Sequence, residues 1–207
     1  MAILRIALTG GIATGKSHVL RRFHFYDVPT IDADAIARDV VRVGRPANAN
    51  IRRQFGGDVF QEDGQIDRPK LAARVFDSPA ERKVLEEIIH PYVRQNIDKW
   101  FKKIELGKNS SFAIAAIPLL FETKRQADFG RVILTICQPG NQFDRLLKRD
   151  EIDAIGAQKR IDAQLPSRQK EDQSDFIVCT DGSYSETEHQ IKEIFNALNR
   201  QATDSQS

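Results

Sequence analysis

The stretch that decides the fold, residues 8–18, reads LTGGIATGKSH. It fits the pattern G-x-x-x-x-G-K-[ST], and the fixed positions are Gly10, Gly15, Lys16 and Ser17. In this pattern small residues let backbone N–H groups converge on phosphate oxygens, and the N-terminus of the next helix adds partial positive charge. The lysine reaches the β- and γ-phosphates, and the hydroxyl helps to hold Mg²⁺. The stretch therefore predicts a site for a nucleoside triphosphate with Mg²⁺.

The residues on either side of this loop supply the context that the motif needs. Residues 3–8 (ILRIAL) form a short apolar run, which is typical of a buried parallel strand. Residues 19–25 (VLRRFHF) have the apolar spacing of a helix. A glycine-rich turn with a chance lysine is the alternative, and the order strand, loop, helix argues against it.

Length and composition indicate an ordinary globular protein. The 207 residues suffice for one α/β domain with a small inserted subdomain. The net charge of +2 gives no strong attraction to nucleic acid or to an anionic membrane, and no apolar run approaches the ~18 residues of a membrane span. We expect no nucleic-acid or membrane partner, and a monomer or weak homo-oligomer. Because the N-terminus leads directly into the first strand, we expect no cleaved signal peptide. Cys137 and Cys179 are expected to be free, buried thiols in the cytoplasm.

Strand-like and helical segments alternate along the chain and predict an α/β fold. After the first strand, four further apolar runs are expected to be strands: Val28–Asp32, Ser111–Phe121, Arg131–Cys137 and Asp175–Cys179. With intervening helices they predict a five-stranded, mostly parallel sheet flanked by helices, the arrangement of a P-loop NTPase.

The remaining segments predict two helical additions to this core. The core is expected at about residues 1–34, 108–144 and 172–200. Residues 35–107 show helical patterns at 35–43, 68–76 and 79–103, so they predict a helical acceptor-binding subdomain over the carboxyl ends of the strands. Residues 145–171 are charged and helical, which suits a mobile lid, and 201–207 are expected to be a flexible tail.

Two acids follow the second predicted strand, in the sequence Asp32-Ala33-Asp34. In a parallel sheet they would face the phosphate loop, where one can orient Mg²⁺ and the other can accept a proton from an attacking hydroxyl. The alternative is that one or both cap the helix expected near Ala35. Both roles can coexist.

Two short motifs do not indicate a protein kinase or a regulatory GTPase. Residues 128–130 read DFG, but no HRD motif precedes them, so they are expected to be the turn before a strand. Residues 153–156 fit D-x-x-G but lie in a charged helical region, and the sequence has no N-K-x-D.

Taken together, the motifs resemble the dephospho-coenzyme A kinase family. The resemblance runs from about residue 6 to residue 191. It includes the phosphate loop, Asp32-Ala33-Asp34, His90-Pro91, the PLLFE stretch Pro118–Glu122, R-L-x-x-R-D at 145–150 and R-x-x-x-Q at 160–164. There are departures. Ala13 replaces the usual glycine, a change that is tolerated only where no positive φ is needed. His18 stands where threonine is common, and residues 180–182 differ in a region expected near the adenine.

The resemblance implies transfer of the ATP γ-phosphoryl group to the ribose 3′-hydroxyl of dephospho-CoA, giving CoA and ADP in the last step of coenzyme A biosynthesis. The residues that it places at ATP are Gly10, Gly11, Ile12, Ala13, Thr14, Gly15, Lys16, Ser17, His18, Arg145 and Arg149. The implied metal ligands for Mg²⁺ are Ser17 and Asp32, and the implied catalytic residues are Lys16, Asp32, Asp34 and Arg149. Asp34 is expected to be the base and Asp32 to lie closer to the metal, although the reverse stays open. Arg149 is expected to close over the triphosphate, while Arg145 is a weaker candidate that could equally be a solvated helix charge.

The same resemblance places six residues at the acceptor, namely Arg74, His90, Pro118, Leu120, Phe121 and Glu122. Each has a structural alternative. Pro91 can simply kink or end a helix, with His90 a satisfied polar group. The leucines of Pro118–Glu122 follow an apolar strand and are first of all core residues.

Two other functions compete with this one. A different small-molecule kinase, acting on a nucleoside, a nucleoside monophosphate or shikimate, would share the phosphate loop but not the DAD and HP motifs. A nucleotide-dependent switch would hydrolyse its nucleotide slowly, and dephospho-CoA would not stimulate it.

Overall fold

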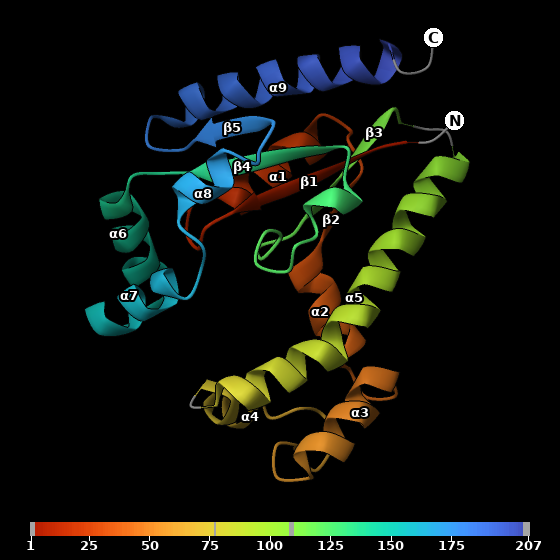
Figure 1. The fold of residues 1–207 in the computed structure, drawn as a ribbon, viewed down its shortest axis with the longest axis vertical. Coiled ribbons are helices and arrows are strands. Elements are labelled where there is room, and N and C mark those ends of the chain that lie inside the picture. Colours follow the sequence, from red (N-terminus) through yellow and green to blue (C-terminus); the bar gives the residue numbers. More distant parts are fainter. Residues whose placement is uncertain (1–2, 77, 108–109, 205–207) are drawn as a thin grey trace. The chain divides into compact units, whose positions relative to one another are not determined.

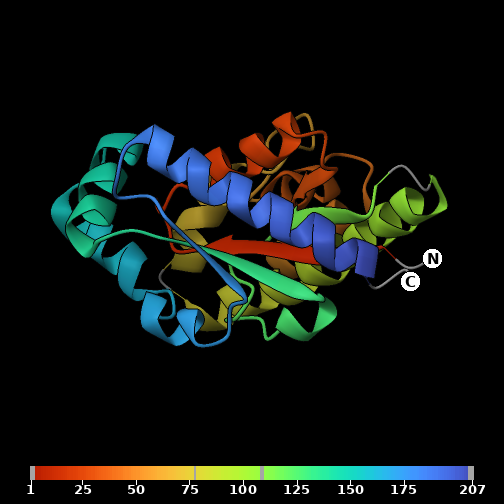
Figure 2. The same cartoon turned by 90° about the horizontal axis from the view of Figure 1, so that it is seen from above.

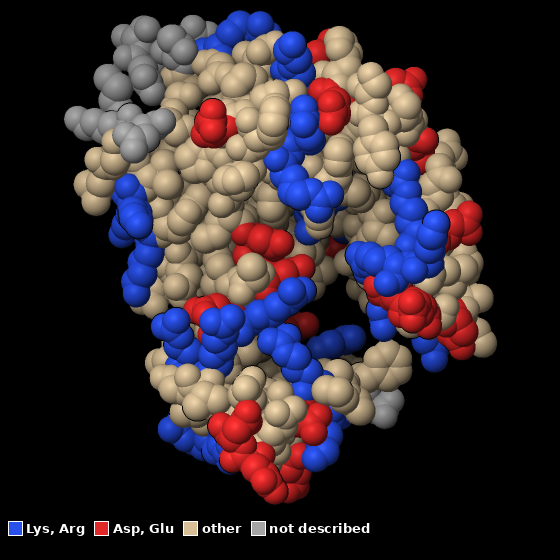
Figure 3. Space-filling model, turned by 180° about the vertical axis from the view of Figure 1, so that it is seen from behind, with Lys and Arg blue, Asp and Glu red and all other residues tan. Residues whose placement is uncertain are grey.

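The computed structural model describes residues 3–76, 78–107 and 110–204, which form two compact units. Ala33–Trp100 make up one, termed the helical unit, and the residues on either side of that stretch make up the other, termed the sheet unit. Within the described ranges, no helix has both the length and the apolar character that crossing a membrane requires. On the face drawn in Figure 3, Lys and Arg side chains are interspersed with Asp and Glu side chains.

The sheet unit is built on five parallel strands in the order β2-β3-β1-β4-β5 (Figure 1). Their bounds are Leu4–Gly10 (β1), Thr30–Asp32 (β2), Phe112–Ala116 (β3), Arg131–Ile136 (β4) and Phe176–Cys179 (β5). Every residue of β3 and the last five of β1 are buried, because both faces of the sheet are covered. The predicted five-stranded sheet is confirmed.

Two predicted strands are shorter in the structure because each contains a proline. The run at 28–32 pairs with β3 only from Thr30 onward, since Pro29 has no N–H group to donate to the ladder. The run at 111–121 leaves the sheet after Ala116, and residues 118–124, beginning with Pro118, form turns. The PLLFE stretch is therefore a turn at the carboxyl edge of the sheet rather than strand.

Helices of the sheet unit pack on the strands. The helix predicted after the phosphate loop is α1 (Lys16–Phe25), and it contacts the C-terminal helix α9 (Tyr184–Asp204). In Figure 2, α9 lies lengthwise across the sheet. The core here includes Ile6, Leu8, Val19, Phe23, Ile191, Ile194 and Leu198. After β4 come α6 (Pro139–Asp150), α7 (Ala154–Asp162) and α8 (Ser167–Glu171), of which α8 contacts β4.

The helical unit contains α2 (Ala33–Val40), α3 (Pro46–Phe55), α4 (Arg68–Phe76) and most of α5 (Pro79–Gly107). The helix α5 continues through Pro91, so this proline does not end the helix. The unit has its own core, formed by Ile51, Phe55, Val59, Phe60 and Leu71 with partly buried aliphatic side chains around them.

The helix α3 was not predicted. Its apolar positions Ala47, Ile51 and Phe55 are all buried and recur every four residues, which is helical spacing. The signal was weak because polar residues separate these positions and two of the intervening residues are asparagine, a poor helix former. Pro46 at the first helical position was the available start signal.

The C-terminal end of the predicted lid is fixed to the turn after β3. The Lys170 side chain is only 1% exposed, and its Nζ lies 2.8 Å from Oε1 of Glu122. The same Oε1 accepts the N–H of Leu165 at 3.0 Å. A lysine in a charged segment predicts a solvated side chain, so nothing local indicated this buried ion pair.

We expect Lys170→Met to lower the free energy of unfolding by about 3 kcal/mol, because it leaves the mostly buried Glu122 carboxylate without its cation. Arg168→Met is the matched control, since Arg168 is exposed on the same helix and should change stability by less than about 0.5 kcal/mol. Urea denaturation measures both. Equal, small effects would show that this ion pair does not stabilise the fold.

Candidate active site

Glycines fix the path of the phosphate loop between β1 and α1. Gly10 pairs with Thr135 of β4, and a Cβ atom on Gly10 would lie 2.0 Å from the Thr135 hydroxyl oxygen. No side chain fits there. Gly15 has a φ of +88°, in the left-handed region that favours glycine, and it immediately precedes α1.

Three threonines hold the middle of the loop. The hydroxyl of Thr14 donates to the Gly11 carbonyl at 2.8 Å and lies 2.8 Å from the Thr135 hydroxyl oxygen. The Thr180 hydroxyl donates to the Thr14 carbonyl at 3.1 Å. All three threonine residues are buried, so these bonds form away from water, where leaving them unmade would be costly.

Two glutamines bind the peptide groups at Ile12. The Ile12 N–H donates to Oε1 of Gln164 at 2.8 Å, and the Ile12 carbonyl accepts from Nε2 of Gln142, also at 2.8 Å. Gln142 lies in α6, and Gln164 follows α7. The segment predicted as a lid therefore contacts the loop directly. The R-x-x-x-Q motif pointed to Gln164 without a role, and sequence reasoning missed Gln142.

The start of α1 is open to an anion. The first N–H groups of a helix have no acceptor within it, and at α1 the cap position is Gly15, which has no side chain to cap them. Lys16 makes no ion pair within the ranges that the structure describes, and the Ser17 side chain is exposed. These groups can bind phosphate oxygens.

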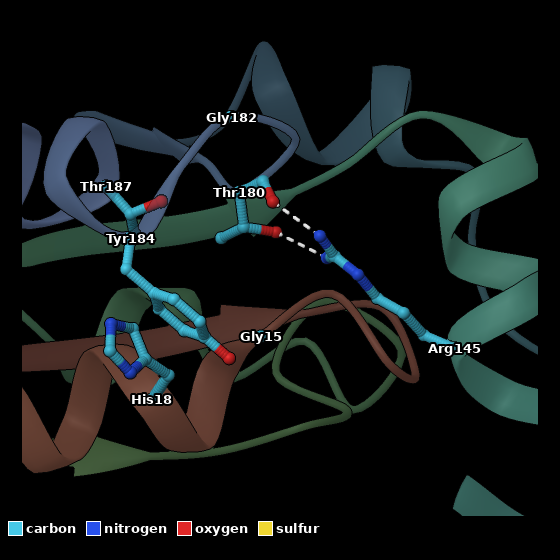
Figure 4. A pocket seen from close by; sticks show the side chains of 7 residues that line it. All are labelled: Gly15, His18, Arg145, Thr180, Gly182, Tyr184 and Thr187. Carbon is cyan, nitrogen blue, oxygen red and sulfur yellow. Dashed lines mark hydrogen bonds between the residues drawn. The ribbon is translucent and has the colours of Figure 1, made fainter. Parts of the chain in front are cut away.

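A pocket of about 370 Å³ adjoins the loop (Figure 4). Its lining residues are Gly15, His18, Arg145, Thr180, Gly182, Tyr184 and Thr187. Arg145 donates through Nη1 to the Thr180 hydroxyl at 2.8 Å and through Nη2 to the Thr180 carbonyl at 2.5 Å. Figure 4 shows Arg145 on one side of Thr180 and the rings of His18 and Tyr184 on the other. Gly15 belongs to both the loop and this pocket, so one ligand can contact both.

His18 and Tyr184 form the aromatic side of this pocket. Their ring centres lie 5.2 Å apart, with the planes inclined at 58°. Partial burial lowers the pKa of His18, and the positive charge of Arg21 acts in the same direction. Nε2 of His18 is buried without a hydrogen-bond partner among the described residues. The histidine, an unexplained extra in the sequence, thus presents a largely neutral ring at neutral pH.

Of the two predicted arginines, the structure brings Arg145 to the pocket. Arg149 instead pairs with its neighbour Asp150, from Nε to Oδ1 at 2.7 Å, and Arg160 binds the same carboxylate. The hydrogen bond from Arg149 lowers the pKa of Asp150. Arg149 therefore binds a neighbouring carboxylate through Nε and Nη2 and is not among the residues that line the pocket.

The two acids of the DAD motif lie on either side of the unit boundary. Asp32 is the last residue of β2, where it pairs with Ala116 at the carboxyl edge of the sheet. Asp34 lies in the first turn of α2 and is exposed. A carboxylate at that position also interacts favourably with the helix dipole, so a structural role accompanies any chemical one.

The six residues predicted at the acceptor have varied surroundings. Leu120 and Phe121 are buried, at 0% and 4% exposure, while Pro118 is half-buried, and Glu122 binds Lys170. In the helical unit, Arg74 binds Glu81 at 2.8 Å and donates to the Phe55 carbonyl at 2.7 Å, and His90 is exposed. Arg74 thus joins the ends of three helices.

Comparison with known proteins gives a consistent result. Residues 4–186 match the family model described as "Dephospho-CoA kinase". A "Dephospho-CoA kinase" from Bacillus cereus is 40% identical over 94% of this chain and 96% of its own length. A Thermus thermophilus structure, TT1252, aligns with a TM-score of 0.81 at 26% identity, covering 96% of this chain and 99% of that one. A "Dephospho-CoA kinase from Campylobacter jejuni" aligns over 96% and 98% of the two chains with a TM-score of 0.66, and at 22% identity it supports the fold.

The loop carries one strained residue, which leads to a prediction. Tolerance of Ala13 was expected to require a negative φ, and this expectation is wrong, because Ala13 has a φ of 59°. We expect Ala13→Gly to raise the free energy of unfolding by about 0.5–1 kcal/mol. Ala72→Gly, on the exposed face of α4, is the control and should lower it by about 1 kcal/mol. Denaturant titration checks both signs. A loss of stability in both variants would show that Ala13 is unstrained.

Proposed function

This chain belongs to the dephospho-CoA kinase family and is a kinase of coenzyme A biosynthesis, and from this premise we propose how its residues act. ATP is the phosphoryl donor, and the ribose 3′-hydroxyl of dephospho-CoA is the acceptor. The observation that carries the proposal is the uncapped start of α1, with Lys16 free of ion pairs in the described chain and a nucleoside-sized pocket sharing Gly15.

In this proposal ATP spans the loop and the adjoining pocket. The triphosphate occupies the start of α1, where the N–H groups and Lys16 offset its charge. The adenosine occupies the pocket between Arg145 and the aromatic pair of His18 and Tyr184. The Arg145 guanidinium and the aromatic rings both have faces on which a base can stack.

Mg²⁺ is proposed to enter with ATP. Mg²⁺ takes oxygen ligands and usually keeps several waters, so one or two protein ligands besides phosphate oxygens suffice. The exposed Ser17 hydroxyl and the Asp32 carboxylate are oxygen donors of the right kind. The ion would offset charge on the phosphates as the bond to the γ-phosphorus breaks.

Asp34 is proposed to accept the proton of the attacking 3′-hydroxyl. Its side chain is exposed, so a substrate hydroxyl can reach it, and it lies on a helix rather than a loop. Phosphoryl transfer depends mainly on positioning and charge neutralisation, so this proton transfer adds to the effect of Lys16 and the metal.

The proposed setting is the cytoplasm. Cys137 and Cys179 are free and half-buried, and this supports a compartment that keeps thiols reduced. The proposed partners are the two small-molecule substrates. A monomer or weak homo-oligomer stays the expectation for its assembly.

The first experiment measures ADP release from purified protein with Mg-ATP, with and without dephospho-CoA, and records the product mass. We expect strong stimulation by dephospho-CoA and a product heavier by one phosphoryl group. Parallel reactions with a nucleoside, a nucleoside monophosphate and shikimate are the controls. Stimulation by one of these instead of dephospho-CoA would assign a different acceptor.

The roles of Asp34 and Lys16 separate in a second measurement. Asp34→Asn should keep ATP affinity and lower kcat by about 10²-fold or more, since the base is lost. Lys16→Ala should weaken ATP binding and turnover together. Asp58→Asn, an exposed acid in the same unit as Asp34, should leave both unchanged. Equal loss of ATP affinity in the Asp34 and Lys16 variants would make Asp34 a metal ligand or a structural residue.

A further inference from the structure

A second pocket, of about 320 Å³, lies entirely within the helical unit. Its lining residues are Asp34, Ala37, Arg38, Val41, Ile51, Ile66, Arg68, Leu71 and Ile89. Five of these are branched aliphatic side chains of the unit's own core, and Ile51 and Leu71 among them are buried. With Ala37 they form an apolar floor, and the exposed charged residues Asp34, Arg38 and Arg68 form a polar rim.

The rim carries two arginines that are available to a ligand. Arg38 and Arg68 are both exposed, and within the described ranges neither makes a hydrogen bond or an ion pair. Neighbouring cations of the unit behave differently. Arg42 and Arg45 pair with Asp39, Lys70 pairs with Asp67, and Arg74 pairs with Glu81. Both arginines that border the pocket therefore have side chains that no carboxylate of the described ranges occupies.

We propose that this pocket binds the diphosphate of dephospho-CoA and the branched carbon next to it, with Arg38 and Arg68 on the phosphates. The inference rests on the proposed function and assigns the acceptor residues that the sequence did not reveal. A guanidinium forms paired, charge-assisted hydrogen bonds with phosphate oxygens. Directly beyond its diphosphate, dephospho-CoA carries a carbon with two methyl groups, whose burial requires an apolar surface.

The order of groups along α2 agrees with this placement. Asp34 and Arg38 are four residues apart, so they are neighbours on one face of the helix, about 6 Å apart at their Cβ atoms. The 3′-hydroxyl and the 5′-phosphate are likewise neighbours on one ribose. A ribose above this face can present its hydroxyl to Asp34 and its phosphates to Arg38.

The lining chemistry favours this part of the acceptor over its adenine. A purine needs hydrogen-bond partners at its edge and gains from aromatic faces. None of the lining residues is aromatic, and beyond the charged rim all are aliphatic. The floor therefore fits methyl and methylene groups.

Steady-state kinetics of Arg38→Gln, Arg68→Gln and the double variant test the assignment. In the double variant we expect the KM for dephospho-CoA to rise about tenfold or more, because two charge-assisted contacts are lost. The KM for ATP should stay within about twofold, since the phosphate loop lies in the sheet unit. Arg53→Gln is the matched control, an exposed arginine of α3 outside the pocket, and should change neither KM. Thermal melting checks that each variant is folded.

A fragment of the acceptor tests whether the pocket binds a phosphate together with the branched carbon. We expect 4′-phosphopantetheine, which has a phosphate and the branched carbon but no adenosine, to inhibit the wild type competitively with dephospho-CoA. It should inhibit the double variant about tenfold less. An unchanged KM for dephospho-CoA in the folded double variant, or equal inhibition of both proteins, would overturn the pocket assignment alone. A wild type that does not phosphorylate dephospho-CoA would overturn the proposed function as well.

Discussion

The open start of α1 is the constraint on which the site depends. A helix end without a cap has N–H groups that need an acceptor, and burying them unsatisfied would be unfavourable. Contacts of the preceding loop hold the start of α1 in position and leave it exposed. Gly10 packs so closely against Thr135 that no side chain fits between them. Gln142 binds the backbone carbonyl of Ile12, and Gln164 binds its N–H group. The first N–H groups of α1 are therefore held in position to bind an anion.

Whether a cation is already paired distinguishes the arginines better than their motif does. A guanidinium bound to a carboxylate gains little by exchanging it for a phosphate, since one ion pair replaces another. Arg74 and Arg149, both predicted at the substrates, are paired with Glu81 and Asp150. Arg38 and Arg68 were not predicted as substrate-binding residues. They border a pocket, and within the described ranges neither side chain forms an ion pair. The arginines that the structure leaves able to bind a phosphate thus include residues that lie outside every motif of the sequence.

Sequence reasoning succeeded where the signal was local. The strands, α1 and the phosphate loop follow from short apolar runs and from glycine spacing. The contacts that hold the loop were not predicted because their partners are distant in sequence: Thr135 is 121 positions from Thr14, and Gln164, which a motif contained without a role, is 152 from Ile12. The buried ion pair of Lys170 was not predicted for the same reason, since its partner Glu122 lies in another segment. The positive φ of Ala13 likewise depends on the path of the folded loop.

The two acids show why a single short motif can serve two substrates. Asp32 ends the sheet unit, Asp34 belongs to the helical unit, and only Ala33 separates them. Under our proposals, the metal-linked carboxylate thus stays with the unit that holds ATP, and the base stays with the unit that holds the acceptor. Transfer requires reacting atoms about 3–3.5 Å apart. Because one residue joins the two carboxylates, the base cannot be far from the metal ligand once both substrates are bound.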